Sequence, residues 1–141
     1  MTSVRFIVPA VPVAQPRIKA AVRGGHAMVY TPKHPVDAFK ACVRMAFKEV
    51  YTGTPLDEPI RCDVEFVFPR PKSMVWRTRA MPRVPHTKKP DRDNCDKAVM
   101  DALTGPAWRD DALVCAGEIT KWIAAGDEQP HALITISTLE F

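Results

Sequence analysis

The chain has 141 residues, of which 46% are hydrophobic and 26% charged, and its formal net charge is +4. This composition excludes a disordered tail, and the length indicates one domain, residues 1–141, with a core of its own. The sequence lacks both an apolar run long enough to span a bilayer and a signal peptide, so we expect a cytoplasmic protein without a membrane partner. The excess of Lys and Arg favours a polyanionic partner.

Cysteine and histidine are spread along the chain. Cysteine occurs at four isolated positions: Cys42, Cys62, Cys95 and Cys115. Histidine is equally dispersed, at His26, His34, His86 and His131. Without a C-x-x-C pair or a close His–Cys pair, the spacing argues against a zinc site and against a disulfide scaffold. We expect reduced thiols that are mostly buried as small apolar groups.

The N-terminal part of the chain predicts a strand followed by a hairpin. Residues 4–8, VRFIV, form an apolar run, and the prolines after it interrupt regular pairing. Residues 17–30 then resemble two short strands, with Gly24 and Gly25 at the turn between them.

A helix and a half-buried strand come next. From about residue 35 to residue 50, apolar residues recur at helical spacing and predict one broad buried face: Val36, Phe39, Val43, Met45, Ala46 and Val50. From residue 60 to residue 68 the pattern alternates, and we expect the apolar side of a strand to be buried: Ile60, Cys62, Val64, Phe66 and Phe68.

Residues 69–90, which we call the basic loop, contain seven Lys or Arg residues and no acid. The prolines in this stretch exclude a regular element. A loop of this length inside a compact domain is usually functional or disordered, and a solvated surface loop is the alternative. Its position directly before a group of acids favours function.

The second helix is predicted from about Asn94 to Leu103, with Asp93 as its N-cap and Gly105 as its C-terminal stop. Its core stripe comprises Cys95, Ala98, Val99, Ala102 and Leu103.

Two alternating segments, residues 111–123 and 131–141, predict the last two strands. Helices and strands are mixed along the chain, without a repeat and without a βαβ series. This order predicts a single α/β domain of the α+β type, with a mixed β-sheet flanked by two main helices.

Acidic residues gather around the second helix. Asp91 and Asp93 lie at its start, while Asp110 and Asp111 follow the turn after it. A helix start and a strand start can meet at one end of a sheet, where carboxylates repel one another unless a cation lies between them. Mg²⁺ suits such a site because it takes oxygen ligands and keeps several waters. Lys97, four residues after Asp93, would share its helix face and could offset charge on a phosphate oxygen.

Each acid also has a structural explanation. Asp93 could cap the helix or form a surface pair with the lysine one turn later. Asp96 suits a first helical turn and Asp101 a solvated position, so both are assigned structural roles. Adjacent Asp110 and Asp111 on a strand would point to opposite faces, which leaves one of them as a ligand. The spacing alone therefore leaves the metal site and the structural alternative open.

Other motifs are absent or weak. An EF-hand that begins at Asp91 needs glycine and glutamate where the chain has Asp96 and Ala102. A Walker loop and a glycine-rich dinucleotide turn are missing from the sequence. The tripeptide Asp-Arg-Asp is similar to the metal-binding D-x-D of some glycosyltransferases, which is a weak signal in so short a chain.

The segments KPDRDNCDKAVMDALTG and WRDDALV together resemble the signature of the RusA family of Holliday-junction resolvases. The family pattern is K-P-D-x-D-N, then x-x-K-A-x-x-D-A-L, and then D-D after a short turn. Family members are small dimeric Mg²⁺-dependent endonucleases that nick four-way DNA junctions. The resemblance implies a RusA-like fold and a bacterial or phage-encoded enzyme that resolves such junctions by paired symmetric nicks in recombination and repair.

Carried over residue by residue, the resemblance implies metal binding by Asp91, Asp93 and Asp111, and catalytic roles for these acids and for Lys97. Asp110 matches the first acid of the D-D pair, whose role as a ligand stays open. The implied cofactor is Mg²⁺, with Mn²⁺ as an alternative and no small-molecule cofactor. The implied partners are branched DNA and a second copy of the chain. Cys95 departs from the pattern, since a leucine is usual there.

Cations of the basic loop are predicted to neutralise DNA phosphates: Arg77, Arg79, Arg83, Lys88 and Lys89. Trp76 could stack at an opened junction centre, or it could anchor the loop on the domain. The alternative function is a non-catalytic branched-DNA-binding protein whose acids only balance charge.

Overall fold

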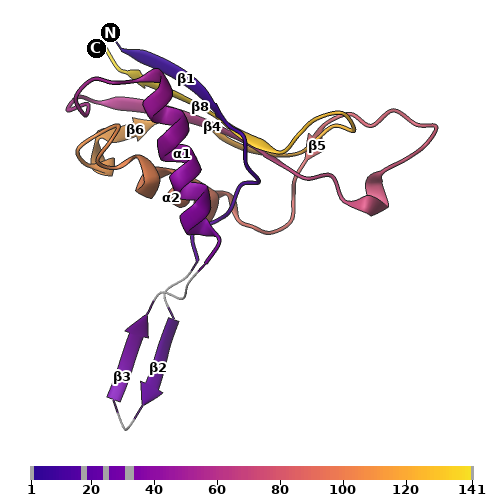
Figure 1. Ribbon diagram of the computed structural model, residues 1–141, viewed down its shortest axis with the longest axis horizontal. Helices are drawn as coiled ribbons and strands as arrows, with labels where there is room; N and C mark the ends of the chain where they lie inside the picture. The colour runs from indigo at the N-terminus through magenta and orange to yellow at the C-terminus, as the bar shows by residue number, and fades with distance from the viewer. Residues whose placement is uncertain (1, 17–18, 24–25, 31–33, 141) are drawn as a thin grey trace.

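The computed structural model describes residues 2–16, 19–23, 26–30 and 34–140 (Figure 1). The elements in chain order are β1 Ser3–Val8, β2 Lys19–Arg23, β3 His26–Tyr30, α1 Val36–Val50, β4 Ile60–Phe68, the 3₁₀ turn η1 Lys72–Met74, β5 Val84–Pro85, α2 Arg92–Leu103, the 3₁₀ turn η2 Asp111–Leu113, β6 Val114–Ala116, β7 Ile119–Ile123 and β8 His131–Thr138. The predicted α+β class, with a mixed sheet and two main helices, is confirmed.

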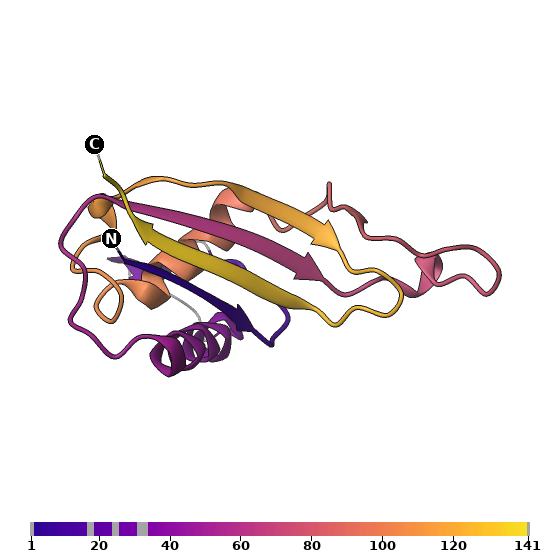
Figure 2. The same cartoon turned by 90° about the horizontal axis from the view of Figure 1, so that it is seen from above.

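The main sheet is built around β4. Its strand order is β1-β8-β4-β7-β5, and β6 pairs with the start of β4. The pairs β1–β8, β8–β4 and β5–β7 are antiparallel, whereas β6 and β7 run parallel to β4. Figure 2 shows β1, β8, β4 and β7 side by side, with α1 beside the sheet. Pairing with β8 from Ile60 to Val67 keeps the alternation of β4 in register, and at the end of the strand Val67 is buried together with Phe66 and Phe68.

The core lies between the two helices and one face of the sheet. All five residues of the predicted α2 stripe are buried, as are the five apolar positions predicted for β4. On α1 the buried residues are Val36, Phe39, Val43 and Phe47. The prediction was wrong for Met45 and Val50, whose side chains are 65% and 47% exposed. Met45 follows Val43 by two residues, or about 200° around a helix, so the two cannot share a face.

The connection from α2 to η2 is anchored by Trp108, which is fully buried. Its Nε1 donates to the Thr104 hydroxyl at 3.1 Å. Leu56 pairs with this connection through its backbone, which donates to Ala107 at 2.8 Å and accepts from Arg109 at 3.3 Å. Gly105 follows the helix as predicted, with a φ of 107° that favours glycine. These contacts therefore fix the position of the backbone where η2 begins.

The segment 111–123 is three elements and not the single strand that its alternation predicts. Gly117 lies between β6 and β7. Its φ of 147° departs from strand geometry and is a backbone angle that residues with a Cβ rarely adopt. A Cβ at Gly117 would also lie 1.9 Å from the carbonyl oxygen of Cys62. Next to this kink, the backbone N–H of Glu118 donates to Asp63 Oδ1 at 2.8 Å. Close approach to β4 thus breaks the strand.

The predicted hairpin is confirmed in its strands, because β2 and β3 pair from Lys19–Tyr30 to Arg23–His26. Its turn residues, Gly24 and Gly25, lie outside the described residues. The basic loop was expected to hold no regular element, but it contains η1 and the short edge strand β5. Proline is tolerated in β5 because an edge strand leaves some backbone groups unpaired.

The four cysteines, all in described parts of the chain, are free thiols, with Cys62 and Cys95 buried and Cys115 exposed. Among the described helices, none has the length and apolar character needed to cross a membrane.

Candidate active site

The start of α2 lies two residues earlier than predicted. Asp91 is the N-cap, with extended backbone angles of −69° and 145°, and its carbonyl accepts the N–H of Cys95 at 3.1 Å. Asp93 was predicted as the cap but lies inside the first turn. A carboxylate there interacts favourably with the positive end of the helix dipole. Asp91 and Asp93 are both exposed, and Asp93 Oδ1 accepts the backbone N–H of Asn94 at 3.0 Å, so its other oxygen and both oxygens of Asp91 remain available to a ligand.

Asp110 and Asp111 lie at the 3₁₀ turn η2 and not at the start of a strand, as had been expected. The Asp110 side chain accepts a hydrogen bond from the backbone N–H of Ala112 at 2.9 Å and so caps the turn. Asp111 is the first residue of the turn and is exposed. One oxygen of Asp110 thus has a structural partner, while Asp111 is the more available ligand.

A hollow of about 360 Å³ lies beside Asp111. Its lining comprises Cys62, Asp96, Met100, Asp111, Val114, Cys115, Ala116, Gly117 and Ile119. Asp96 was assigned an ordinary first-turn position, yet the structure places it in this hollow. Its Oδ1 is buried without a hydrogen-bond partner among the described residues, and burial raises the pKa of this carboxyl. Asp96 also lies three residues after Asp93, on the same side of α2.

The acids do not form a closed metal site by themselves. Within the described ranges, no group of three or more His, Cys, Asp or Glu side chains is placed to hold an ion. The donor chemistry nevertheless fits a hard divalent cation, because Asp91, Asp93 and Asp111 offer exposed carboxylate oxygens. Mg²⁺ commonly takes only one or two carboxylates, and water and substrate phosphate complete its shell.

Lys97 lies one turn after Asp93 and is exposed. Among the described residues it forms no ion pair, whereas Asp101 pairs with Lys40 at 3.6 Å. The surface pair that was the alternative role for Lys97 is therefore not formed. Its ammonium group remains available to a phosphate.

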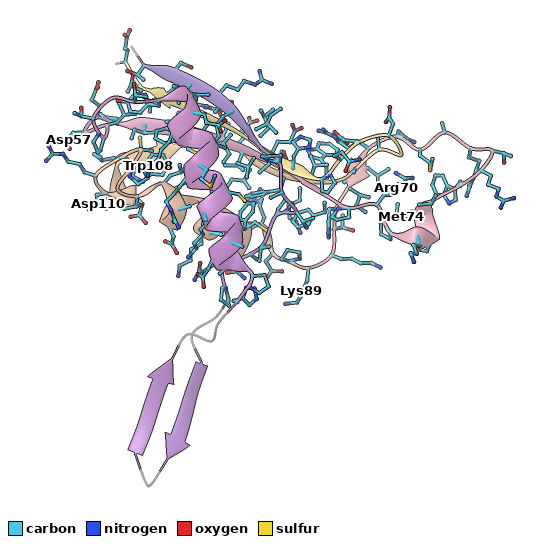
Figure 3. All side chains as sticks on the ribbon, viewed as in Figure 1. Asp57, Arg70, Met74, Lys89, Trp108 and Asp110 are labelled. Carbon is cyan, nitrogen blue, oxygen red and sulfur yellow. The ribbon has the colours of Figure 1, made fainter. Side chains whose placement is uncertain are left out.

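The basic loop is held by specific hydrogen bonds. Arg70 donates from Nε to the carbonyl of Met74 at 2.7 Å, and from Nη1 to the carbonyls of Pro82 at 2.8 Å and Ala124 at 3.2 Å. Two guanidinium groups lie over the Trp76 ring, with the Arg70 carbon 4.9 Å and the Arg79 carbon 4.1 Å from its centroid. Trp76 thus contacts other residues of the basic loop, and its two predicted roles, stacking on DNA and anchoring the loop on the domain, stay predictions. The loop extends past the helix-covered part of the domain, and Figure 3 labels Arg70 and Met74 in it.

The five cations predicted to bind phosphate fall into two groups. Arg83 is half-buried and pairs with both Glu65 and Glu128. The bond from Arg83 holds the pKa of Glu128 below its usual value. The other four are exposed and outside any ion pair of the described residues: Arg77, Arg79, Lys88 and Lys89.

Lys121 was not among the predicted site residues, yet its ammonium group donates to the carbonyls of Lys88 and Pro90 just before Asp91. The signal was present in the pattern ITKWI, which places Lys121 on the same side of a strand as Ile119 and Ile123. A lysine on an apolar strand face needs partners for its ammonium group.

The fold and site define a small α+β domain with exposed carboxylates at a helix start and a 3₁₀ turn, next to a basic loop. Residues 9–137 match the family model of the endodeoxyribonuclease RusA, so the chain belongs to this family, as its motif predicts. The chain is also similar to the uncharacterized protein YqaN of Bacillus subtilis (strain 168), with 28% identity over 141 residues that cover 96% of each chain. Membership of the family implies Holliday-junction resolvase endonuclease activity on branched DNA. Nucleases of this type generally depend on a divalent metal.

Proposed function

We propose that this protein is a Mg²⁺-dependent endonuclease that resolves four-way DNA junctions by paired symmetric nicks, in bacterial or phage DNA within the cytoplasm. The observation that carries the proposal is the set of exposed groups Asp91, Asp93, Lys97 and Asp111, which stand at the motif positions of a chain matched to the family over residues 9–137. The exposed cations of the basic loop support a DNA substrate.

In this mechanism Asp91, Asp93 and Asp111 hold the metal, and Asp110 orients Asp111 by capping η2. When bound, Mg²⁺ or Mn²⁺ supplies Lewis-acid polarisation of the phosphate and a water of lowered pKa. Lys97 places a positive charge beside the phosphate on which negative charge develops during hydrolysis. The basic loop binds the DNA phosphate backbone. The protein therefore recognises the junction by its shape and charge more than by its bases.

The function is tested by incubating the protein with labelled four-way, flap and linear duplex DNA in Mg²⁺ or EDTA. We expect cleavage of the four-way junction in Mg²⁺, little cleavage of the duplex, and none in EDTA. Tight junction binding without cleavage in Mg²⁺ or Mn²⁺ would instead identify the non-catalytic branched-DNA-binding protein.

Lys97→Ala is expected to lower the single-turnover cleavage rate by about 100-fold, because a charge that stabilises the transition state is removed. Junction affinity in Ca²⁺ should stay within about twofold of wild type, since one exposed cation among many is lost. Lys48→Ala, which removes an exposed lysine at the end of α1, is the control. A Lys97→Ala rate within twofold of wild type would exclude the catalytic role.

Loss of Arg77 and Lys89 together is expected to reduce the slope of log K against log salt by up to about 1.8, or about 0.9 for each phosphate contact on B-form arms. These two are chosen because Arg83 is already paired within the protein and Arg79 stacks on Trp76. The matched control is Lys48→Gln with Arg5→Gln, which removes two exposed charges on α1 and β1. Equal slopes for Arg77→Gln with Lys89→Gln and for the control pair would show that the basic loop does not bind phosphate.

The proposal includes a homodimer, because two nicks in opposite strands of a twofold-symmetric junction need two related active sites. Light scattering should give a particle of about twice the 15.7 kDa chain mass. A monomer in both the free and the junction-bound protein would contradict the dimer and leave the metal site unaffected.

A further inference from the structure

Lys121 on β7 connects the sheet to the segment that leads into Asp91. Its Nζ donates to the carbonyl of Lys88 at 2.7 Å and to that of Pro90 at 2.5 Å. Its own backbone carbonyl accepts the N–H of His86 at 3.0 Å. Three hydrogen bonds from one strand residue therefore hold the end of the basic loop.

The side chain of Lys121 lies on the helix-covered face of the sheet. Its register partner on β4 is Phe66, which is fully buried on that face. Lys121 is half-buried, and two carbonyl oxygens satisfy two of the three donors of its ammonium group. Among the described acids none forms an ion pair with Lys121, so these carbonyls are its observed partners.

The carbonyl of Pro90 belongs to the peptide plane that also contains the nitrogen and Cα of Asp91. Fixing this oxygen therefore fixes the direction in which the backbone enters Asp91. On the other side, the carbonyl of Asp91 accepts the first hydrogen bond of α2 from Cys95 at 3.1 Å. Asp91 is thus held between Lys121 and the helix.

We propose that Lys121 is a positioning residue, which holds the backbone at Asp91 so that its carboxylate faces the metal. The proposal rests on the proposed function, because it assigns Asp91 to the metal site. It differs from the role of Lys97, whose exposed ammonium group is directed to the substrate.

The test compares Lys121→Met with Lys121→Arg and with Lys48→Met, which removes the same group from an exposed position on α1. Lys121→Met is expected to weaken Mn²⁺ binding to the DNA-free protein by about 10- to 100-fold, the usual effect of losing a group that orients a ligand. It should also speed hydrogen exchange at the backbone amides of residues 86–95. Lys121→Arg should bind Mn²⁺ within about threefold of wild type, since its guanidinium donates to the same carbonyls.

A folded Lys121→Met protein with Mn²⁺ affinity within twofold of wild type would overturn the proposal. If Lys121→Met does not fold, Lys121→Gln is measured instead, with the same loss expected and the same twofold criterion. A wild-type protein that binds Mn²⁺ but cuts no branched DNA would overturn the proposed function, and the Mn²⁺ affinities would still decide the role of Lys121.

Discussion

Asp91→Asn is expected to lower junction cleavage by at least about 100-fold, because loss of a ligand should cost no less than loss of a group that merely orients one. Asn keeps the size of the side chain and can still lie at the helix N-cap, so the fold should be preserved. The change removes no cation, and junction affinity in Ca²⁺ should therefore stay within about threefold of wild type. Single-turnover cleavage and gel-shift binding measure the two quantities separately.

The matched control is Glu49→Gln, which removes one carboxylate charge from an exposed acid near the end of α1. Glu49 forms no ion pair among the described residues and lies outside the motif. This control should cleave at the wild-type rate. Cleavage by Asp91→Asn at that same rate would remove Asp91 from the active site.

Trp108→Ala is expected to lower the free energy of unfolding by about 3–5 kcal/mol, the usual cost of truncating a large buried aromatic residue. Trp108 is fully buried, and its loss would also remove the hydrogen bond to Thr104. Urea denaturation followed by circular dichroism measures the change. Because Trp108 anchors the connection into η2, any folded fraction should also place Asp111 less well.

Trp76→Ala serves as the comparison for Trp108→Ala. Trp76 is half-buried in the basic loop, where the guanidinium groups of Arg70 and Arg79 lie over its ring. It does not belong to the main core. Its truncation should cost clearly less stability than that of Trp108. If both variants lost the same free energy of unfolding, Trp108 would not be the anchor of this connection that its burial indicates.

The parts of the fold that could be predicted are those governed by a local period. The alternation of β4 and the stripe on α2 both appear as predicted, because each lies against the same core along its length. The roles of the motif acids and of Lys97 stay predictions, because they rest on the motif and on the exposure of these side chains.

The parts that could not be predicted depend on contacts between distant segments. The alternation of 111–123 is interrupted because Gly117 approaches the carbonyl of Cys62 on β4. The placement of Asp96 in the hollow follows from how α2 packs over β6 and β7, which its position in the helix does not indicate. The pairing of Arg83 with Glu65 and Glu128 likewise joins three separate segments.

The most direct test of the central claim uses a supercoiled plasmid that extrudes a cruciform from an inverted repeat. Two nicks at symmetric positions across the cruciform convert this plasmid into a linear molecule. We expect the wild-type protein to yield linear DNA in Mg²⁺, and we expect no product in EDTA or with Asp91→Asn. Plasmid that remains supercoiled in both Mg²⁺ and Mn²⁺, or that is cut equally well without the inverted repeat, would contradict the account.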